Sequence, residues 1–178
     1  MGLLRSAGTG CAVAMAAGAL SACGEEQRED TTPALSSPRV AMTASYPGYA
    51  PFALITYRDG HGRVCHGLGS VTPDGPRVMG ALDMSLGVGL AKHGTCLRRE
   101  GRDVSVQIRR AGGGARIVGG IARAGVTRVL VAGQSVRTRR NGEFLVVQPS
   151  DAGPVGDEIE LEYHAGHHRR LPLRLVTS

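Results

Sequence analysis

The chain has 178 residues, of which 42% are hydrophobic, so it is long enough for one domain with a core of its own. Only 3% of the residues are aromatic and 27 are glycines, so the core must be aliphatic, and the composition favours strands and turns over helices. The net charge is +6, with Lys92 as the single lysine beside twenty arginines, and the few aromatic rings that could stack on bases argue against a nucleic-acid partner.

Residues 1–22 have the organisation of a signal peptide. Arg5 is the one basic side chain before an apolar stretch over residues 6–20 that is rich in Ala, Gly and Leu. This stretch has the length of the apolar region of a signal peptide and is shorter than the roughly 20 apolar residues that a transmembrane helix needs. Export across a membrane is therefore expected.

The next four residues are the most specific motif in the chain. Leu20-Ser21-Ala22-Cys23 resembles the lipobox of bacterial lipoproteins, in which a small residue precedes an obligatory cysteine. The resemblance implies cleavage after Ala22, a diacylglyceryl thioether on Cys23, and attachment to the cell membrane on its extracytoplasmic side. The alternative is an ordinary secretory signal, cut nearby, that leaves Cys23 free. The abundance of Ala, Gly, Val and Arg is similar to that of proteins from GC-rich genomes, as in many actinobacteria.

Residues 23–50 are expected to form a flexible linker between the membrane and the domain. Acidic and hydroxyl residues come first, followed by Pro33, Pro38 and Pro47, and most of the segment has no apolar period. A flexible chain of this length spans roughly 30 Å, which would lift a small domain clear of the lipid headgroups.

Residues 51–178 are expected to form a single β domain. Short apolar segments recur at roughly 8–12-residue spacing with turn residues between them, the pattern of a β-sandwich or barrel. The expected strands are 52–57, 63–71, 104–108, 116–122, 126–131, 135–139, 144–148, 159–163 and 171–175. The predicted fold class is all-β, with an immunoglobulin-like β-sandwich as the leading architecture, although no tryptophan is present for the buried core position of antibody domains.

Local patterns add detail to this prediction. Residues 104–108 read Val-Ser-Val-Gln-Ile, an alternation that is typical of a strand with one buried face. Residues 72–95 fit either an alternating strand or a short helix. Asn141-Gly142 predicts a hairpin with a type I′ turn. Pro172 places the last strand at a sheet edge, because proline has no N–H for a β-ladder.

Two cysteines remain in the mature domain if Cys23 is lipidated. Cys65 and Cys96 are then an even pair in an oxidising compartment, and a disulfide between them is the simplest outcome. It would close a loop of about 32 residues and contribute roughly 3–4 kcal/mol. The alternatives are two buried thiols, a metal site formed by Cys65, His66 and Cys96, or a site that His61 and His66 share with Cys65.

A group of histidines surrounds the last predicted turn, and its members are His164, His167 and His168. Imidazoles that lie close together can bind Cu²⁺, Ni²⁺ or Zn²⁺, and Glu160 and Glu162 could assist. Arg169 and Arg170 follow directly, and their charge would oppose a cation. An exposed polar turn without metal is therefore the main expectation, and no cofactor is expected.

Five arginines would form a basic patch if the last two hairpins are adjacent, and they are Arg137, Arg139, Arg140, Arg169 and Arg170. Such a patch could contact phosphate or an anionic cell-wall polymer. A solvated basic surface without a partner is the alternative.

Known catalytic motifs are absent from the sequence. There is no Gly-x-Ser-x-Gly around a nucleophile, and Ser70 only partly resembles one; the glycines at 112–114 and 119–120 lack the Lys-Ser/Thr of a phosphate loop. We therefore expect a lipoprotein that is not an enzyme and that binds another protein, the cell wall or a small ligand. The alternatives are a metal-binding lipoprotein that uses the histidine turn and an enzyme without a recognisable motif.

Overall fold

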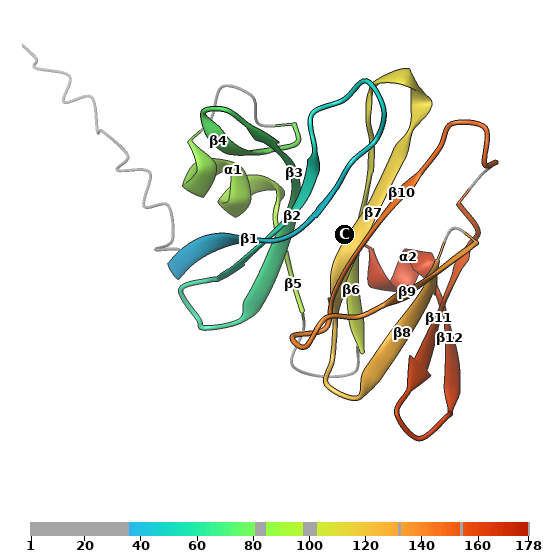
Figure 1. Ribbon diagram of the computed structural model, residues 1–178. Coiled ribbons are helices and arrows are strands. Elements are labelled where there is room, and N and C mark those ends of the chain that lie inside the picture. The colour runs from blue at the N-terminus through green and yellow to red at the C-terminus, as the bar shows by residue number, and fades with distance from the viewer. Residues whose placement is uncertain (1–35, 81–84, 98–102, 132, 154, 178) are drawn as a thin grey trace, which may run out of the picture. The chain divides into compact units, whose positions relative to one another are not determined.

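The computed structural model describes residues 36–80, 85–97, 103–131, 133–153 and 155–177, and these are mostly β-structure (Figure 1). The strands are β1 (Ser36–Ala44), β2 (Phe52–Arg58), β3 (Val64–Thr72), β4 (Gly75–Val78), β5 (Thr95–Cys96), β6 (Val104–Arg110), β7 (Arg116–Ala122), β8 (Val126–Val131), β9 (Gln134–Arg137), β10 (Glu143–Gln148), β11 (Glu158–Tyr163) and β12 (His168–Pro172). The helices are α1 (Leu86–His93), the short 3-10 helix η1 (Gly112–Gly114) and α2 (Leu173–Val176). No helix in the described part of the chain is long and apolar enough to cross a membrane.

The described strands form three antiparallel sheets. Sheet A has the order β1-β2-β3-β4, with β5 paired to β3; sheet B has the order β10-β7-β6, and sheet C has the order β12-β11-β8-β9. Sheet B lies in the middle, because its two faces pack against different partners. Ile117 and Leu145 pack against Leu54 and Leu68 of sheet A. Figure 1 shows the same order of layers.

The other face of sheet B forms the larger core with sheet C. Val118, Phe144 and Val146 pack there against Val129 and Leu161. The predicted all-β sandwich is thus confirmed, with two sheet-to-sheet interfaces in place of one. The immunoglobulin-like arrangement stays a prediction.

Two glycines in the central strand β7 allow the layers to approach closely. A Cβ on Gly119 would lie 2.7 Å from the Leu68 side chain, and a Cβ on Gly120 would lie 2.1 Å from the Ser105 carbonyl oxygen. Real Cβ contacts are longer than this, so larger residues would force the strands or sheets apart. The glycines are therefore packing residues of a strand that is buried on both faces.

Helix α1 covers the face of sheet A that points away from sheet B. Leu90 is fully buried and packs with Ile55 and Tyr57, over the position of Gly67, where a Cβ would lie 2.8 Å from the leucine side chain. The Tyr57 hydroxyl donates a hydrogen bond to the Leu90 carbonyl at 3.0 Å. Of the two expectations for residues 72–95, the short helix is therefore the correct one for 86–93, whereas 81–84 lie outside the described residues.

Strand β1 corrects the second half of the linker predicted over residues 23–50. Residues 36–44 pair with β2, and Ala41 is buried. The register shifts twice, between Ser36 and Arg39 and between Val40 and Met42. Such bulges break the two-residue period, which is why no strand pattern is visible in the sequence. Residues 23–35 lie outside the described part of the chain.

The turn at Asn141-Gly142 also differs from its prediction. The Gly142 N–H donates to the Arg139 carbonyl at 2.8 Å, which makes Gly142, with a φ of 80°, the fourth turn residue and not a central one. The strands that it joins lie in different sheets, β9 in sheet C and β10 in sheet B. The type I′ hairpin is therefore wrong, and the turn instead carries the chain between layers.

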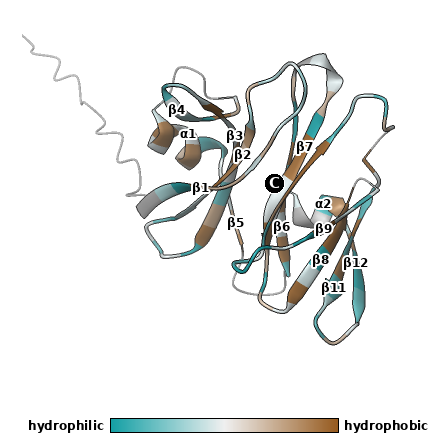
Figure 2. Ribbon diagram, in the orientation of Figure 1, coloured by the Kyte–Doolittle hydropathy of each residue, from teal (hydrophilic) through white to brown (hydrophobic). Residues whose placement is uncertain are grey.

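The last strand is shorter than predicted. β12 lies at the edge of sheet C, as Pro172 suggested, and its residues are mostly hydrophilic and exposed (Figure 2). The chain then turns into α2, and Leu173 is buried in the core between sheets B and C. The predicted strand over 171–175 ends at Pro172 because Leu173 must leave the sheet plane to reach this core.

Candidate anion-binding groove

A surface cavity of about 540 Å³ lies where three connections meet at the end of sheet C. It is lined by residues 123–128, from the β7–β8 turn into β8, by 137–140, from the end of β9 into the β9–β10 turn, and by Glu162 and His164 at the end of β11 and just after it. We call this cavity the arginine groove, because five arginines line it: Arg123, Arg128, Arg137, Arg139 and Arg140.

The sheet register explains why two of these arginines are adjacent. Arg128 on β8 lies directly opposite Arg137 on β9 and, on its other side, opposite Glu162 on β11. Inward-facing Val129 alternates with exposed Arg128, so the arginine side chain points away from sheet B. Like charges in directly opposite positions destabilise a sheet. Within the described residues, no carboxylate forms an ion pair with Arg128 or Arg137.

Arg139, in the β9–β10 turn, is held by contacts with backbone carbonyls. The Arg139 N–H donates to the Glu143 carbonyl at 2.8 Å, and the Arg139 Nη1 donates to the Ala41 carbonyl at 2.9 Å. A carbonyl carries no net charge, so the guanidinium charge of Arg139 remains. Among the described residues that line it, the groove thus has five arginines and one carboxylate, that of Glu162. A concave, like-charged surface of this kind concentrates counter-ions.

The structure separates the five arginines that the sequence grouped together. Arg137 and its two neighbours in the turn line the groove, whereas Arg169 and Arg170 belong to β12 at the opposite edge of sheet C. Arg169 forms an ion pair with Asp103, which also accepts a hydrogen bond from the Tyr163 hydroxyl at 2.8 Å. Arg170 is 2.9 Å from Glu160. These two charges are therefore paired outside the groove.

Sequence reasoning missed Arg123 and Arg128. Arg128 alternates with Val129 in a predicted strand, so its exposure followed from the pattern. The order of the strands in sheet C did not, and only that order places β8 beside β9.

The three histidines of the last turn are not brought together. His164 lines the arginine groove, His167 is exposed in the turn, and His168 Nδ1 lies 2.8 Å from Glu160 Oε1 on the outer face of sheet C. Their ring nitrogens do not form a cluster within 4.8 Å. The hydrogen bonds of Glu160 to His168 and Arg170 lower the pKa of its carboxyl. The Glu160 carboxylate, which could assist a metal, is thus already hydrogen-bonded to His168 and Arg170.

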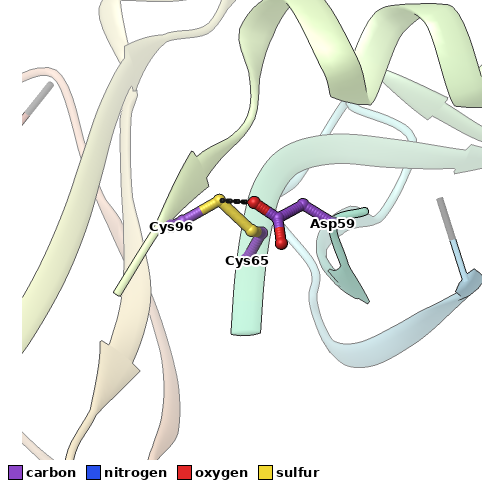
Figure 3. Close-up of side chains that lie close together, drawn as sticks. All are labelled: Asp59, Cys65 and Cys96. Atoms are coloured by element: carbon purple, nitrogen blue, oxygen red, sulfur yellow. Dashed lines mark hydrogen bonds between the residues drawn. A yellow bond between two sulfur atoms is a disulfide. The ribbon is translucent and has the colours of Figure 1, made fainter. Parts of the chain in front are cut away.

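The Cys65–Cys96 disulfide is present, as predicted. The two residues are directly opposite each other on β3 and β5, and Asp59 Oδ2 lies 4.0 Å from Cys96 Sγ (Figure 3). Asp59 and the two cysteines are the one group of potential metal ligands that lie close together in the described chain. Both sulfur atoms form the disulfide bond. The two alternatives for this pair, two buried thiols and a metal site with cysteine ligands, are therefore wrong.

His66 is on the opposite side of β3 from its neighbour Cys65, because side chains alternate along a strand. It points toward sheet B, where its Nε2 lies 3.1 Å from the Ser105 hydroxyl. Burial lowers the pKa of His66 to about 4, so the ring is neutral at physiological pH. His66 is therefore a buried packing residue and not a ligand beside the cysteines.

Ser70, in the partial nucleophile motif, lies on β3 and is half-buried. Cys23 and the lipobox lie outside the described residues.

Comparison of the chain with protein-family models, with curated proteins and with solved structures found no match.

Proposed function

We propose that this chain is a membrane-anchored lipoprotein whose domain, on the extracytoplasmic side, is a non-catalytic binding module for an anionic, phosphate-bearing polymer of the cell envelope. The observation that carries the proposal is the arginine groove, whose described lining includes five arginines and one carboxylate. The lipobox at Cys23 supports the location and the anchor.

The groove favours phosphate for a chemical reason. A guanidinium is planar, stays charged at any physiological pH, and forms paired hydrogen bonds with two oxygens of one phosphate. Arg128 and Arg137 lie side by side across two strands, so one phosphate group could accept hydrogen bonds from both. Arg139 and Arg140 follow in the turn and would contact the next anionic group along the chain. A polymer with regularly repeated charge would therefore bind better than a single ion.

The test is a binding titration of the purified full chain with poly(glycerol phosphate), with neutral dextran as the comparison polymer. We expect saturable binding of the phosphate polymer that weakens as salt is added, because the groups involved are exposed. Replacement of Arg128 and Arg137 by glutamine should weaken binding by about tenfold or more, since each removes charge-assisted hydrogen bonds.

Arg169→Gln with Arg170→Gln is the matched control. It removes the same net charge, but from arginines that are paired with Asp103 and Glu160 outside the groove. Binding that is lost equally in both double variants would mean that only net charge matters. Binding that survives in both would exclude the groove. Stronger binding to vesicles that contain phosphatidylglycerol than to the polymer would replace the proposed partner by the membrane surface.

A further inference from the structure

A second cavity, of about 520 Å³, lies where sheets A and B meet, and it is separate from the arginine groove. We call it the inter-sheet cavity. Its polar lining comes from segments far apart in the sequence: Arg39 on β1, Thr56 and Arg58 on β2, Asn141 in the β9–β10 turn and Glu143 on β10. Its apolar lining includes Val64 on β3 and Ile121 on β7.

The carboxylate of Glu143 is the central polar group of this cavity. Its side chain is only 4% exposed, and its Oε1 takes both of its side-chain hydrogen bonds, from Arg39 Nη2 at 2.5 Å and from Asn141 Nδ2 at 3.5 Å. Oε2 accepts no hydrogen bond from any described residue. A carboxylate can accept about four hydrogen bonds, and Oε2 is not one of the enclosed atoms, so a molecule in the cavity can reach it. Glu143 therefore has unused capacity for a donor.

Thr56 contributes to the wall of the same cavity, but its Oγ1 is enclosed by the protein and cannot be reached by a bound molecule. The acceptor that a ligand can reach is therefore Oε2 of Glu143, on a side chain that is otherwise buried.

We propose that the inter-sheet cavity binds a neutral, hydroxyl-rich ligand, such as one or two rings of a saccharide. Arg39 and Arg58 would repel a cationic ligand, and the free oxygen of Glu143 would repel an anionic one. A hydroxyl group can donate to Glu143 Oε2 and accept from Asn141 or Arg39 at the same time. The ligand can thus bind without breaking the Arg39–Glu143 ion pair.

The remaining walls of the cavity fit the same ligand class. Val64, which is half-buried, offers apolar surface to the C–H face of a sugar ring, whereas Ile121 is almost fully buried. The volume lies within the roughly 300–1,000 Å³ that is usual for small-molecule sites. The proposal does not depend on the arginine groove, because the two cavities share no lining residue.

The experiment is an NMR titration of the purified full chain, in a detergent without a sugar headgroup, with maltose, cellobiose and chitobiose. The amide signals of Thr56 and Ile121 should shift and saturate with at least one of the three. Glucosamine and gluconate, which carry opposite charges, should bind more weakly than their neutral counterparts. No saturable shift with any of the three disaccharides, at concentrations up to tens of millimolar, would overturn the proposal.

Two variants test the residues. Glu143→Gln should weaken saccharide binding by about tenfold or more, because it replaces a charged acceptor. Asn141→Asp keeps a residue that is favoured in turns and should also weaken binding, because it removes the amide donor. Stronger binding of glucosamine than of glucose to the unchanged protein would show a cation site and contradict the proposal.

Glu160→Gln is the control, because this carboxylate is held by His168 and Arg170 on the outer face of sheet C. It should bind saccharide as the unchanged protein does. The double variant of Arg128 and Arg137 should also bind saccharide normally, whatever happens to polymer binding. Loss of saccharide binding in either control would refute the assignment to the inter-sheet cavity.

Discussion

Lowering the pH should destabilise the fold through His66, which is fully buried on β3 between sheets A and B. Its Nε2 lies 3.1 Å from the Ser105 hydroxyl, and its Nδ1 is buried without a partner among the described residues. A charged imidazole at this place would have no carboxylate partner within the described chain. Burial accordingly lowers the pKa of His66 from 6.5 to about 4.

The sign and size of the effect follow from this difference. Between about pH 6.5 and pH 4, the unfolded chain binds a proton at His66 and the folded chain does not, so the free energy of unfolding falls as the pH falls. The full pKa difference corresponds to about 3 kcal/mol, lost mostly between those two pH values. Below about pH 4 the folded state also takes up the proton, and the loss through His66 levels off.

The assay is urea unfolding, followed by circular dichroism, at several pH values between about 7.5 and 3. Carboxylates also titrate in this range, so the informative quantity is the difference in pH dependence between the unchanged protein and His66→Gln. Glutamine keeps an amide near the Ser105 hydroxyl and does not titrate. His167→Gln, in an exposed turn, is the control and should follow the unchanged protein. Equal pH dependence in the unchanged protein and in His66→Gln would refute the reasoning.

Three further predictions concern the cysteines and the central strand. Replacing Cys65 and Cys96 together by serine should lower the free energy of unfolding by roughly 3–4 kcal/mol, measured by urea titration, because a loop of about 32 residues is no longer closed. Cys23→Ser should move the protein from the membrane fraction to the soluble fraction or block its processing, as fractionation and intact-mass measurement would show. Gly120→Ala should lower the free energy of unfolding by about 3 kcal/mol or more, measured by urea titration, because the new Cβ would lie 2.1 Å from the Ser105 carbonyl oxygen. An unchanged free energy of unfolding would contradict the close packing of β6 against β7.

Much of the strand content was predictable because the apolar segments are short and separated by turn residues. Strands β2, β7, β8, β10 and β11 agree with their predicted ranges to within a residue. The number of layers was not predictable. Residues 104–108 alternate apolar and polar side chains, which indicates one buried face, yet Ser105 and Gln107 are both buried. Their polar side chains face another sheet of the same domain and not water.

Gln107 shows why such residues are tolerated between sheets. Its Oε1 accepts a hydrogen bond from the Leu68 N–H at 3.1 Å, and its Nε2 donates to the His93 carbonyl at 2.7 Å. The side chain therefore joins β6 to β3 and to the end of α1. A polar residue whose donors and acceptors are matched in this way costs little to bury. A single sequence does not show which polar side chain has such a match.

The arginine groove was only partly predictable for a related reason. The exposure of Arg128 and Arg137 follows from strand alternation and turn composition, but their contact depends on which strands are neighbours in sheet C. Arg169 and Arg170 have the same local sequence character and nevertheless lie at the other edge of that sheet. Local patterns therefore predict which side chains are exposed, and the order of strands decides which of them share a site.

The two faces of sheet B differ in what they bury, and this difference accounts for where the inter-sheet cavity occurs. The buried cluster on the face toward sheet C is apolar, and the polar Gln148 is buried at the end of β10 on the same side. The face toward sheet A changes from apolar, at Leu145 and Ile117, to polar, at Glu143 and Ser105. Apolar packing holds the layers together at one end, whereas at the other end the sheets meet through side chains that need hydrogen-bond partners. A cavity at that polar end can bind a hydroxyl-rich molecule without loss of the aliphatic contacts that keep sheets A and B together.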